Sequence, residues 1–179
     1  VEIKKPIDAI QNSIAYVTED RKKQGLFLDL SVRNNITMAS LDQITSKFKF
    51  IKTSKEIEKT NDLVGTLKIK TQSINHFIKY LSGGNQQKTV IARWLMKNAK
   101  VVIFNEPTVG IDIGSKYEIY NLINELSSKN ISILIFGSET QELLRLCNRI
   151  YTMVKGGVIT NEFKTNEITE QQLMESITS

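Results

Sequence analysis

The feature that most constrains this chain is a pair of glycines at the start of a predicted helix. The helix is predicted from apolar residues at helical spacing, which are Val90, Ile91, Leu95 and Met96. Ser82 stands where it can cap this helix, and Gly83 and Gly84 allow another molecule to approach the backbone closely. Free N–H groups and the positive end of the helix dipole then predict an anion-binding site.

A predicted buried strand that ends in a carboxylate follows this helix. The run 101–104 is continuously apolar, and Asn105, Glu106 and Pro107 come directly after it. Proteins with parallel sheets place their ligands at the carboxyl ends of strands, where a carboxylate can orient water for attack on a γ-phosphate. Glu106 is therefore the candidate catalytic residue, and the alternative is an ordinary surface glutamate. Together the two features indicate nucleotide chemistry.

Composition narrows the class of protein. A chain of 179 residues with 40% hydrophobic residues can bury one substantial core. Its apolar runs are far shorter than the roughly 20 residues that a membrane-spanning helix needs, and no secretory leader is predicted. The single cysteine, Cys147, excludes an internal disulfide and fits a reducing compartment. The net charge of +5 comes from scattered lysines, which favours a solvated surface over a nucleic-acid face.

Predicted strands and helices alternate along the chain. Strands are predicted at 14–17, 101–104 and 131–136, and helices at 115–128 and 139–147. Strands that are continuously apolar and separated by helices indicate a parallel sheet covered on both faces. The sequence therefore predicts the α/β class.

Residues 26–80 are predicted to form a small helical insert. Ser31 is the predicted cap of its first helix, 42–53 a loop, and Ser54 the cap of its second helix. Near the end of the chain, the glycine pair in Lys155-Gly156-Gly157 predicts a β-hairpin.

The motifs resemble those of ABC-type ATPases, and most closely the second module of the ATP-binding subunits of monosaccharide importers. The resemblance covers nearly the whole chain and rests on four stretches, which are Glu19–Lys22, Leu81–Lys88, Glu106–Gly114 and Ser138-Glu139. It implies a partial ABC-ATPase fold, with a RecA-like core over 1–25 and 81–179. That core has a mostly parallel sheet with flanking helices, and the helical subdomain spans 26–80.

The phosphate-binding P-loop of the family is missing from the sequence. No Gly-x-x-x-x-Gly-Lys-Ser/Thr pattern occurs in it, so the P-loop strand and helix are expected upstream of Val1. The lack of an initiator methionine suggests an excised or processed piece. The chain alone is therefore expected to be inactive, although the resemblance implies an ATPase in the intact subunit.

The resemblance also implies roles for individual residues. Nucleotide contacts fall to the signature, Leu81, Ser82, Gly83, Gly84, Asn85 and Gln86, and to Glu19, Asp112 and Ser138. Asn105 replaces the aspartate that usually holds Mg²⁺, Glu19 the usual glutamine of the Q-loop, and Ser138 the usual switch histidine. Because Asn105 lacks a negative charge, metal binding is expected to be weaker. The alternatives are a strand-end asparagine at Asn105, an exposed loop acid at Glu19 and a plain helix cap at Asp112.

The function implied by the resemblance is ATP hydrolysis coupled to monosaccharide uptake, with ATP and Mg²⁺ as cofactors. The expected partners are membrane permease subunits, a second ATPase module or another copy of the chain, and indirectly a periplasmic or lipoprotein sugar-binding protein. The expected location is the cytoplasmic face of the cell membrane, as a peripheral protein. One alternative is a non-catalytic module that supplies signature and docking contacts. Another is an ABC protein acting on ribosomes or DNA, which the signature disfavours.

Overall fold

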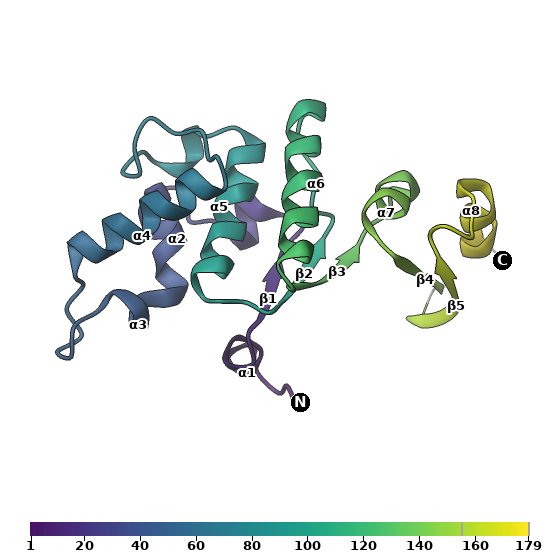
Figure 1. Ribbon diagram of the computed structural model, residues 1–179, viewed down its shortest axis with the longest axis horizontal. Coiled ribbons are helices and arrows are strands. Elements are labelled where there is room, and N and C mark those ends of the chain that lie inside the picture. The colour runs from purple at the N-terminus through teal and green to yellow at the C-terminus, as the bar shows by residue number, and fades with distance from the viewer. Residues whose placement is uncertain (155, 179) are drawn as a thin grey trace. The chain divides into compact units, whose positions relative to one another are not determined.

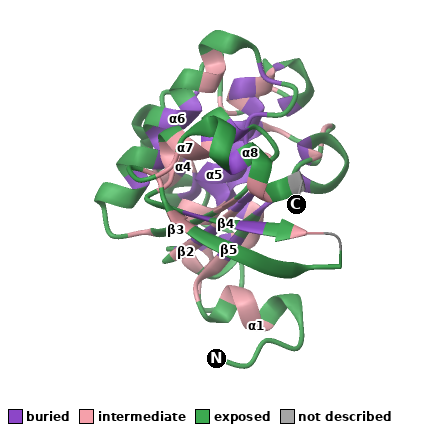
Figure 2. Ribbon diagram, turned by 90° about the vertical axis from the view of Figure 1, so that its right-hand side faces the viewer, coloured by how far each residue is buried: buried purple, intermediate pink, exposed green. Residues whose placement is uncertain are grey.

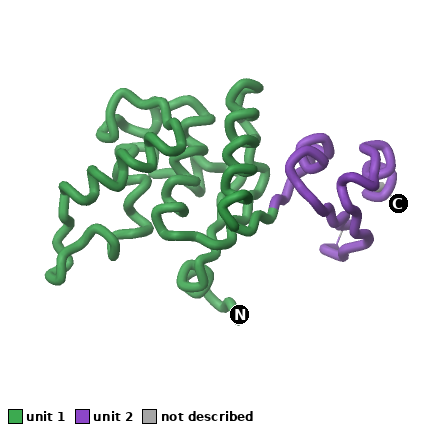
Figure 3. The backbone as a smooth tube through the Cα atoms, viewed as in Figure 1, with its two compact units in different colours: residues 1–134 green, residues 135–179 purple. Residues whose placement is uncertain are grey.

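The computed structural model describes residues 1–154 and 156–178 and divides into two compact units, Val1–Leu134 and Ile135–Ser179 (Figure 3). In chain order its helices and strands are α1 (Pro6–Gln11), β1 (Ile14–Val17), η1 (Arg21–Gly25), α2 (Val32–Thr37), η2 (Met38–Ser40), α3 (Leu41–Ile44), α4 (Thr53–Thr66), η3 (Ile78–Tyr80), α5 (Gly83–Met96), β2 (Val101–Asn105), α6 (Ile113–Ser128), β3 (Ser132–Phe136), α7 (Thr140–Leu146), β4 (Arg149–Val154), β5 (Val158–Lys164) and α8 (Glu170–Thr178).

A three-stranded sheet in the order β1-β2-β3 carries the candidate site, and β1 and β2 run parallel. One face of this pair is buried, because Val17 and its partner Phe104 are both fully inaccessible to solvent. The other face is only partly covered, since Tyr16 is 45% exposed and its partner Ile103 is half-buried. The expectation that the sheet is covered on both faces is therefore wrong, although the predicted α/β class is confirmed.

Helix α5 is the central helix of the first unit. Helices α2 and α4 pack against it, and so does α6 (Figure 1). Figure 2 shows α5 as buried over much of its length, and the buried run extends from Gln86 to Arg93. The apolar face predicted for α6 is confirmed, because its buried residues include Ile119, Leu122, Ile123 and Leu126. The start of α5 is therefore held by its neighbours.

Two helix starts in residues 26–80 test the capping predictions. Ser31 caps α2 as predicted, because its Oγ accepts a hydrogen bond from the Asn34 N–H at 3.1 Å. Ser54 does not cap α4, because α4 starts at Thr53 and Lys52 occupies the N-cap position. The predicted loop over 42–53 is also interrupted, since its first residues belong to α3.

The second unit contains α7, α8 and an antiparallel hairpin of β4 and β5. The predicted hairpin is confirmed, and its strands pair from Arg149 with Lys164 to Val154 with Val158. Of the predicted turn, Lys155 lies outside the described residues. Gly156 and Gly157 have φ angles of 101° and 80°, a region that glycine enters without steric cost.

Candidate functional site

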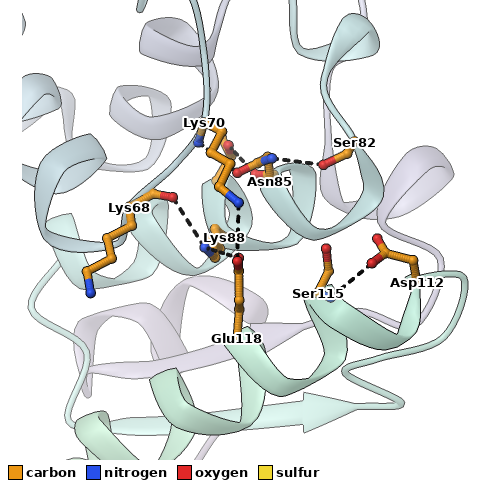
Figure 4. Close-up of polar contacts among 9 residues, drawn as sticks. Lys68, Lys70, Ser82, Asn85, Lys88, Asp112, Ser115 and Glu118 are labelled. Atoms are coloured by element: carbon orange, nitrogen blue, oxygen red, sulfur yellow. Dashed lines mark hydrogen bonds and ion pairs between the residues drawn. The ribbon is translucent and has the colours of Figure 1, made fainter.

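The exposed start of α5 is the first part of the candidate site (Figure 4). Ser82 occupies the N-cap position, but its hydroxyl accepts a hydrogen bond from Asn85 Nδ2 at 2.8 Å and not from a backbone N–H. The predicted capping bond is therefore wrong. Asn85 Oδ1 accepts from the backbone N–H of Lys70 at 2.7 Å, which ties this helix start to the end of residues 26–80.

Three residues of the predicted signature are buried, which are Leu81, Gly84 and Gln86. Gln86 Nε2 donates to the Ile78 carbonyl at 3.2 Å. A Cβ built on Gly84 would lie 2.6 Å from the Ser115 Cβ, so only glycine lets α5 approach α6 this closely. The side chains of Leu81 and Gln86 thus support the helix start, and the exposed groups belong to Ser82 and its neighbours.

A buried lysine joins α5 to α6. The side chain of Lys88 is 5% exposed, and its Nζ lies 2.7 Å from Glu118 Oε2 and 3.2 Å from the Lys68 carbonyl oxygen (Figure 4). Lys70 Nζ lies 3.3 Å from the other Glu118 oxygen. The hydrogen bond from Lys88 is the main reason that the pKa of Glu118 is lowered.

Acid should weaken the link between α5 and α6. A carboxyl group whose pKa falls on folding stabilises the protein at pH values above its ordinary pKa, which is 4.5 for Glu118. This stabilisation is lost as the pH falls through the lowered pKa of the folded protein. Because the Glu118 side chain is 42% exposed, we expect a loss below about 1 kcal/mol. Urea unfolding at pH 6 and pH 3.5 should show a smaller pH dependence for Glu118→Gln than for the wild type.

A matched control is available on the same helix. Glu125 is 50% exposed on its side chain and pairs with Lys129. Glu125→Gln should keep more of the pH dependence than Glu118→Gln, because Glu125 pairs with one lysine and Glu118 with two. An equal pH dependence in Glu118→Gln and the wild type would contradict the assigned role of Glu118.

The carboxylate of Glu106 lies at the end of β2. Its backbone φ of 47° is in the left-handed region, which costs a non-glycine residue roughly 1–2 kcal/mol. Within the described part of the chain, this carboxylate has no hydrogen bond or ion pair. Strained backbone and an unpaired carboxylate at a sheet edge are typical of a functional position.

Asn105 and Glu19 lie at the same sheet edge as Glu106. Asn105 Nδ2 donates to the Tyr16 hydroxyl at 3.2 Å, so the strand-end alternative is partly correct, with a side chain as the partner. Glu19 is exposed and follows Val17, which pairs with Phe104, so both glutamates follow the last strand pair by two residues.

The donors at this edge fit a magnesium ion. Mg²⁺ binds through one or two carboxylates together with water and substrate phosphates, and it does not need a complete cage of side chains. The Glu19 carboxylate and the Asn105 amide oxygen are suitable oxygen donors. Over residues 1–154 and 156–178, no group of three His, Cys, Asp or Glu side chains could hold an ion alone.

The remaining predicted site residues, Asp112 and Ser138, have different surroundings. Asp112 Oδ1 accepts a hydrogen bond from the Ser115 N–H at 3.0 Å, which caps α6 and lowers the pKa of Asp112. The predicted cap is therefore confirmed. Ser138 belongs to the second unit, where it follows β3.

A buried arginine that the sequence analysis missed holds α5 to the helical region. Arg93 is 8% exposed and donates to the carbonyl oxygens of Asn35 at 2.6 Å and Gly25 at 2.7 Å. Desolvation lowers its pKa to about 10. Its burial could have been predicted from its position directly after the apolar residues Val90, Ile91 and Ala92, in a helix with few exposed positions.

The sequence of residues 2–109 matches the family described as ABC transporter. The chain belongs to the ABC transporter family. Two members of this family are similar over 97% of the chain. The xylose import ATP-binding protein of Moorella thermoacetica is 46% identical over 174 residues, and the ribose import ATP-binding protein of Clostridium tetani is 42% identical over 174 residues. In both cases the chain spans 34% of the relative's length.

Solved ABC structures share the fold. A nucleotide-free ATP-binding cassette superposes with a TM-score of 0.76 at 24% identity, over 97% of this chain and 68% of that one. A dimeric post-hydrolysis cassette bound to ADP and Pi superposes with a TM-score of 0.71 at 19% identity, over 93% of this chain and 70% of that one. The predicted partial ABC-ATPase fold is therefore confirmed. None of the described helices has the length and apolar character to cross a membrane.

Proposed function

We propose that the chain is part of the ATP-binding subunit of a monosaccharide importer, which couples ATP hydrolysis to sugar uptake. The relatives named for xylose and ribose import support the sugar class. The observation that carries the catalytic part is the unpaired Glu106 carboxylate, held in a left-handed backbone at the carboxyl edge of the sheet. That edge is where α/β proteins bind their ligands.

The proposed mechanism uses two parts of the first unit, the carboxyl edge of its sheet and the start of α5. The Glu106 carboxylate orients a water molecule and accepts its proton as the water attacks the γ-phosphate. Ser82, Gly83 and Asn85 at the start of α5 bind phosphate oxygens of nucleotide held on a second module, through hydrogen-bond donors and the helix dipole. The aligned donors stabilise the charge that builds up on the transferred phosphoryl group.

The proposed cofactors are ATP and Mg²⁺. Asn105 and Glu19 would hold the magnesium ion, which neutralises phosphate charge when bound. Asp112, next to the start of α5, would contact the neighbouring module, and the family resemblance gives Ser138 the place of the switch histidine. These roles follow the family resemblance and the position of Asn105 at the sheet edge.

The proposed partners follow from the start of α5 and the family resemblance. The signature helix would serve nucleotide held on a second ATPase module or another copy. The dimeric state of a cassette with the same fold, bound to ADP and Pi, supports pairing with a second module. Membrane permease subunits would hold the chain peripherally on the cytoplasmic membrane face. A sugar-binding protein would be an indirect partner.

A second candidate function is a non-catalytic module that supplies signature and docking contacts. The amide of Asn105 favours it, because this side chain carries no charge and one end is engaged with the Tyr16 hydroxyl. A metal site without that negative charge binds Mg²⁺ more weakly.

Asn105→Asp separates the two functions. In the full-length transporter, the added charge should lower the Mg²⁺ concentration for half-maximal ATP hydrolysis by about tenfold, or about 1.4 kcal/mol. Asn61→Asp adds the same charge on an exposed part of α4 and should change nothing. An unchanged Mg²⁺ requirement would contradict the metal role of Asn105. No hydrolysis with either residue, with ATP-dependent assembly retained, would favour the non-catalytic module.

A further inference from the structure

We propose that Arg21 is a positioning residue that fixes the turn after Glu106 against the start of α5. The inference rests on the proposed function, because it concerns how that site is held together. Arg21 belongs to η1, directly after the loop that carries Glu19. It therefore links three segments of the site that are far apart in the sequence.

The guanidinium of Arg21 binds two consecutive carbonyl oxygens. Nη1 donates to Val109 O at 2.7 Å, and Nη2 donates to Gly110 O at 2.8 Å. Val109 lies in the turn that starts at Glu106, because the Val109 N–H donates to the Glu106 carbonyl at 3.2 Å. Arg21 thus holds the segment directly after the candidate catalytic carboxylate.

The same guanidinium lies against the first residue of α5. A Cβ built on Gly83 would lie 2.6 Å from Arg21 Nη2 and 2.9 Å from the Gly110 carbonyl oxygen. Only a residue without a side chain leaves room for this contact. Gly110 also needs glycine's freedom, since its φ is 66°. The two glycines and the arginine therefore form one packed contact.

The other end of Arg21 is anchored in the loop that carries Glu19. The Arg21 N–H donates to the Glu19 carbonyl at 3.1 Å, and Asp20 Oδ1 accepts from the Lys23 N–H at 3.1 Å. The Glu19 loop therefore cannot shift far without breaking the two side-chain bonds of Arg21. A movement at Glu19 would be transmitted to the turn after Glu106 and to Gly83.

The contact requires an arginine and not any cation. Arg21 is only 7% exposed, and burial lowers its pKa. A guanidinium presents parallel donors in a rigid fork, which matches two adjacent carbonyl oxygens. The lysine ammonium is a single point of charge, so it can hold one carbonyl well but not both in register. The cost of burying the cation indicates that its position matters.

The test measures ATP hydrolysis by the full-length transporter with Arg21→Lys and Arg21→Met. Both variants should lower kcat, by roughly 10- to 100-fold for methionine and less for lysine, because a misplaced catalytic group reacts slowly. The KM for Mg-ATP should change less than kcat, because both side-chain bonds of Arg21 go to the turn after Glu106. Lys22→Met, at the exposed neighbouring position, should leave both constants unchanged.

Amide hydrogen exchange provides a readout that does not depend on activity. In Arg21→Lys, exchange should accelerate at Val109 and Ile111, whose N–H groups close the turn, and stay unchanged along β1 and β2. A wild-type transporter without ATPase activity would overturn the proposed function but leave this exchange test intact. Normal kcat together with normal exchange in both variants would overturn the role of Arg21. A uniform rise in exchange over the first unit would also overturn it, because Arg21 would then only stabilise the fold.

Discussion

Glu106→Gln is expected to lower the kcat of ATP hydrolysis by about 10²- to 10⁴-fold, the usual contribution of a general base. Glutamine keeps the size and one oxygen of the side chain but cannot accept a proton from water. Because the Glu106 carboxylate has no partner among the described residues, its replacement should leave the fold intact. Steady-state hydrolysis by the full-length transporter measures kcat, and calorimetry checks that Mg-ATP still binds.

The control for this variant is Glu58→Gln. Glu58 is exposed on α4, so the same chemical change there should leave kcat and binding unchanged. If Glu106→Gln hydrolyses ATP at the wild-type rate, the general base lies elsewhere. Loss of Mg-ATP binding together with kcat would also contradict the assignment, since Glu106 is proposed to act on water and not on binding.

Arg93→Met is expected to lower the free energy of unfolding by about 2–4 kcal/mol. Methionine fills similar space but leaves the carbonyl oxygens of Asn35 and Gly25 without their buried donor, at roughly 1–3 kcal/mol each. Removing a desolvated charge offsets part of this loss. Urea unfolding of the full-length protein, followed by tryptophan fluorescence at the adjacent Trp94, measures the change.

Arg93→Lys and Lys100→Met separate charge from geometry. Lysine keeps the positive charge but cannot reach both carbonyl oxygens in the same way, so Arg93→Lys should be destabilised nearly as much as Arg93→Met. Lys100 is exposed, and Lys100→Met should change the free energy of unfolding by less than about 0.5 kcal/mol. Wild-type stability in Arg93→Met would show that the link between α5 and α2 is dispensable.

The strands were predictable because their signal is local. The apolar run 14–17 has the same bounds as β1, and 101–104 falls short of β2 by one residue. The covering of the sheet was not predictable in this way. Val17 and Tyr16 belong to the same continuous apolar run, yet Val17 is buried and Tyr16 is exposed. Which face is covered depends on the elements packed against it, and a strand's own sequence does not specify them.

The polar interior of the site was harder to predict. Serines at predicted helix starts gave a correct cap at Ser31 but not at Ser54, which lies inside α4, or at Ser82, whose hydroxyl accepts from the Asn85 side chain. Arg21, Lys88 and Arg93 resemble ordinary surface charges in the sequence, yet all are buried. Their partners are mostly backbone carbonyl oxygens, which leave no pattern in the sequence.

These buried cations explain how the start of α5 can be held rigidly. Lys88 connects α5 to Glu118 on α6, and Arg93 connects it to Asn35 on α2. Arg21 lies against its first residue, Gly83. The helix end is thus fixed before any ligand arrives, which lowers the cost of ordering on binding.

Mg-ATP binding to the 179-residue chain, measured by calorimetry with and without a P-loop-bearing partner module, tests the central claim most directly. If the chain supplies one half of a shared nucleotide site, Mg-ATP should bind only when the partner is present. Ser82→Ala together with Asn85→Ala should then weaken that binding, because both side chains lie at the exposed start of α5. Tight binding by the chain alone, or no binding in either case, would contradict the shared site.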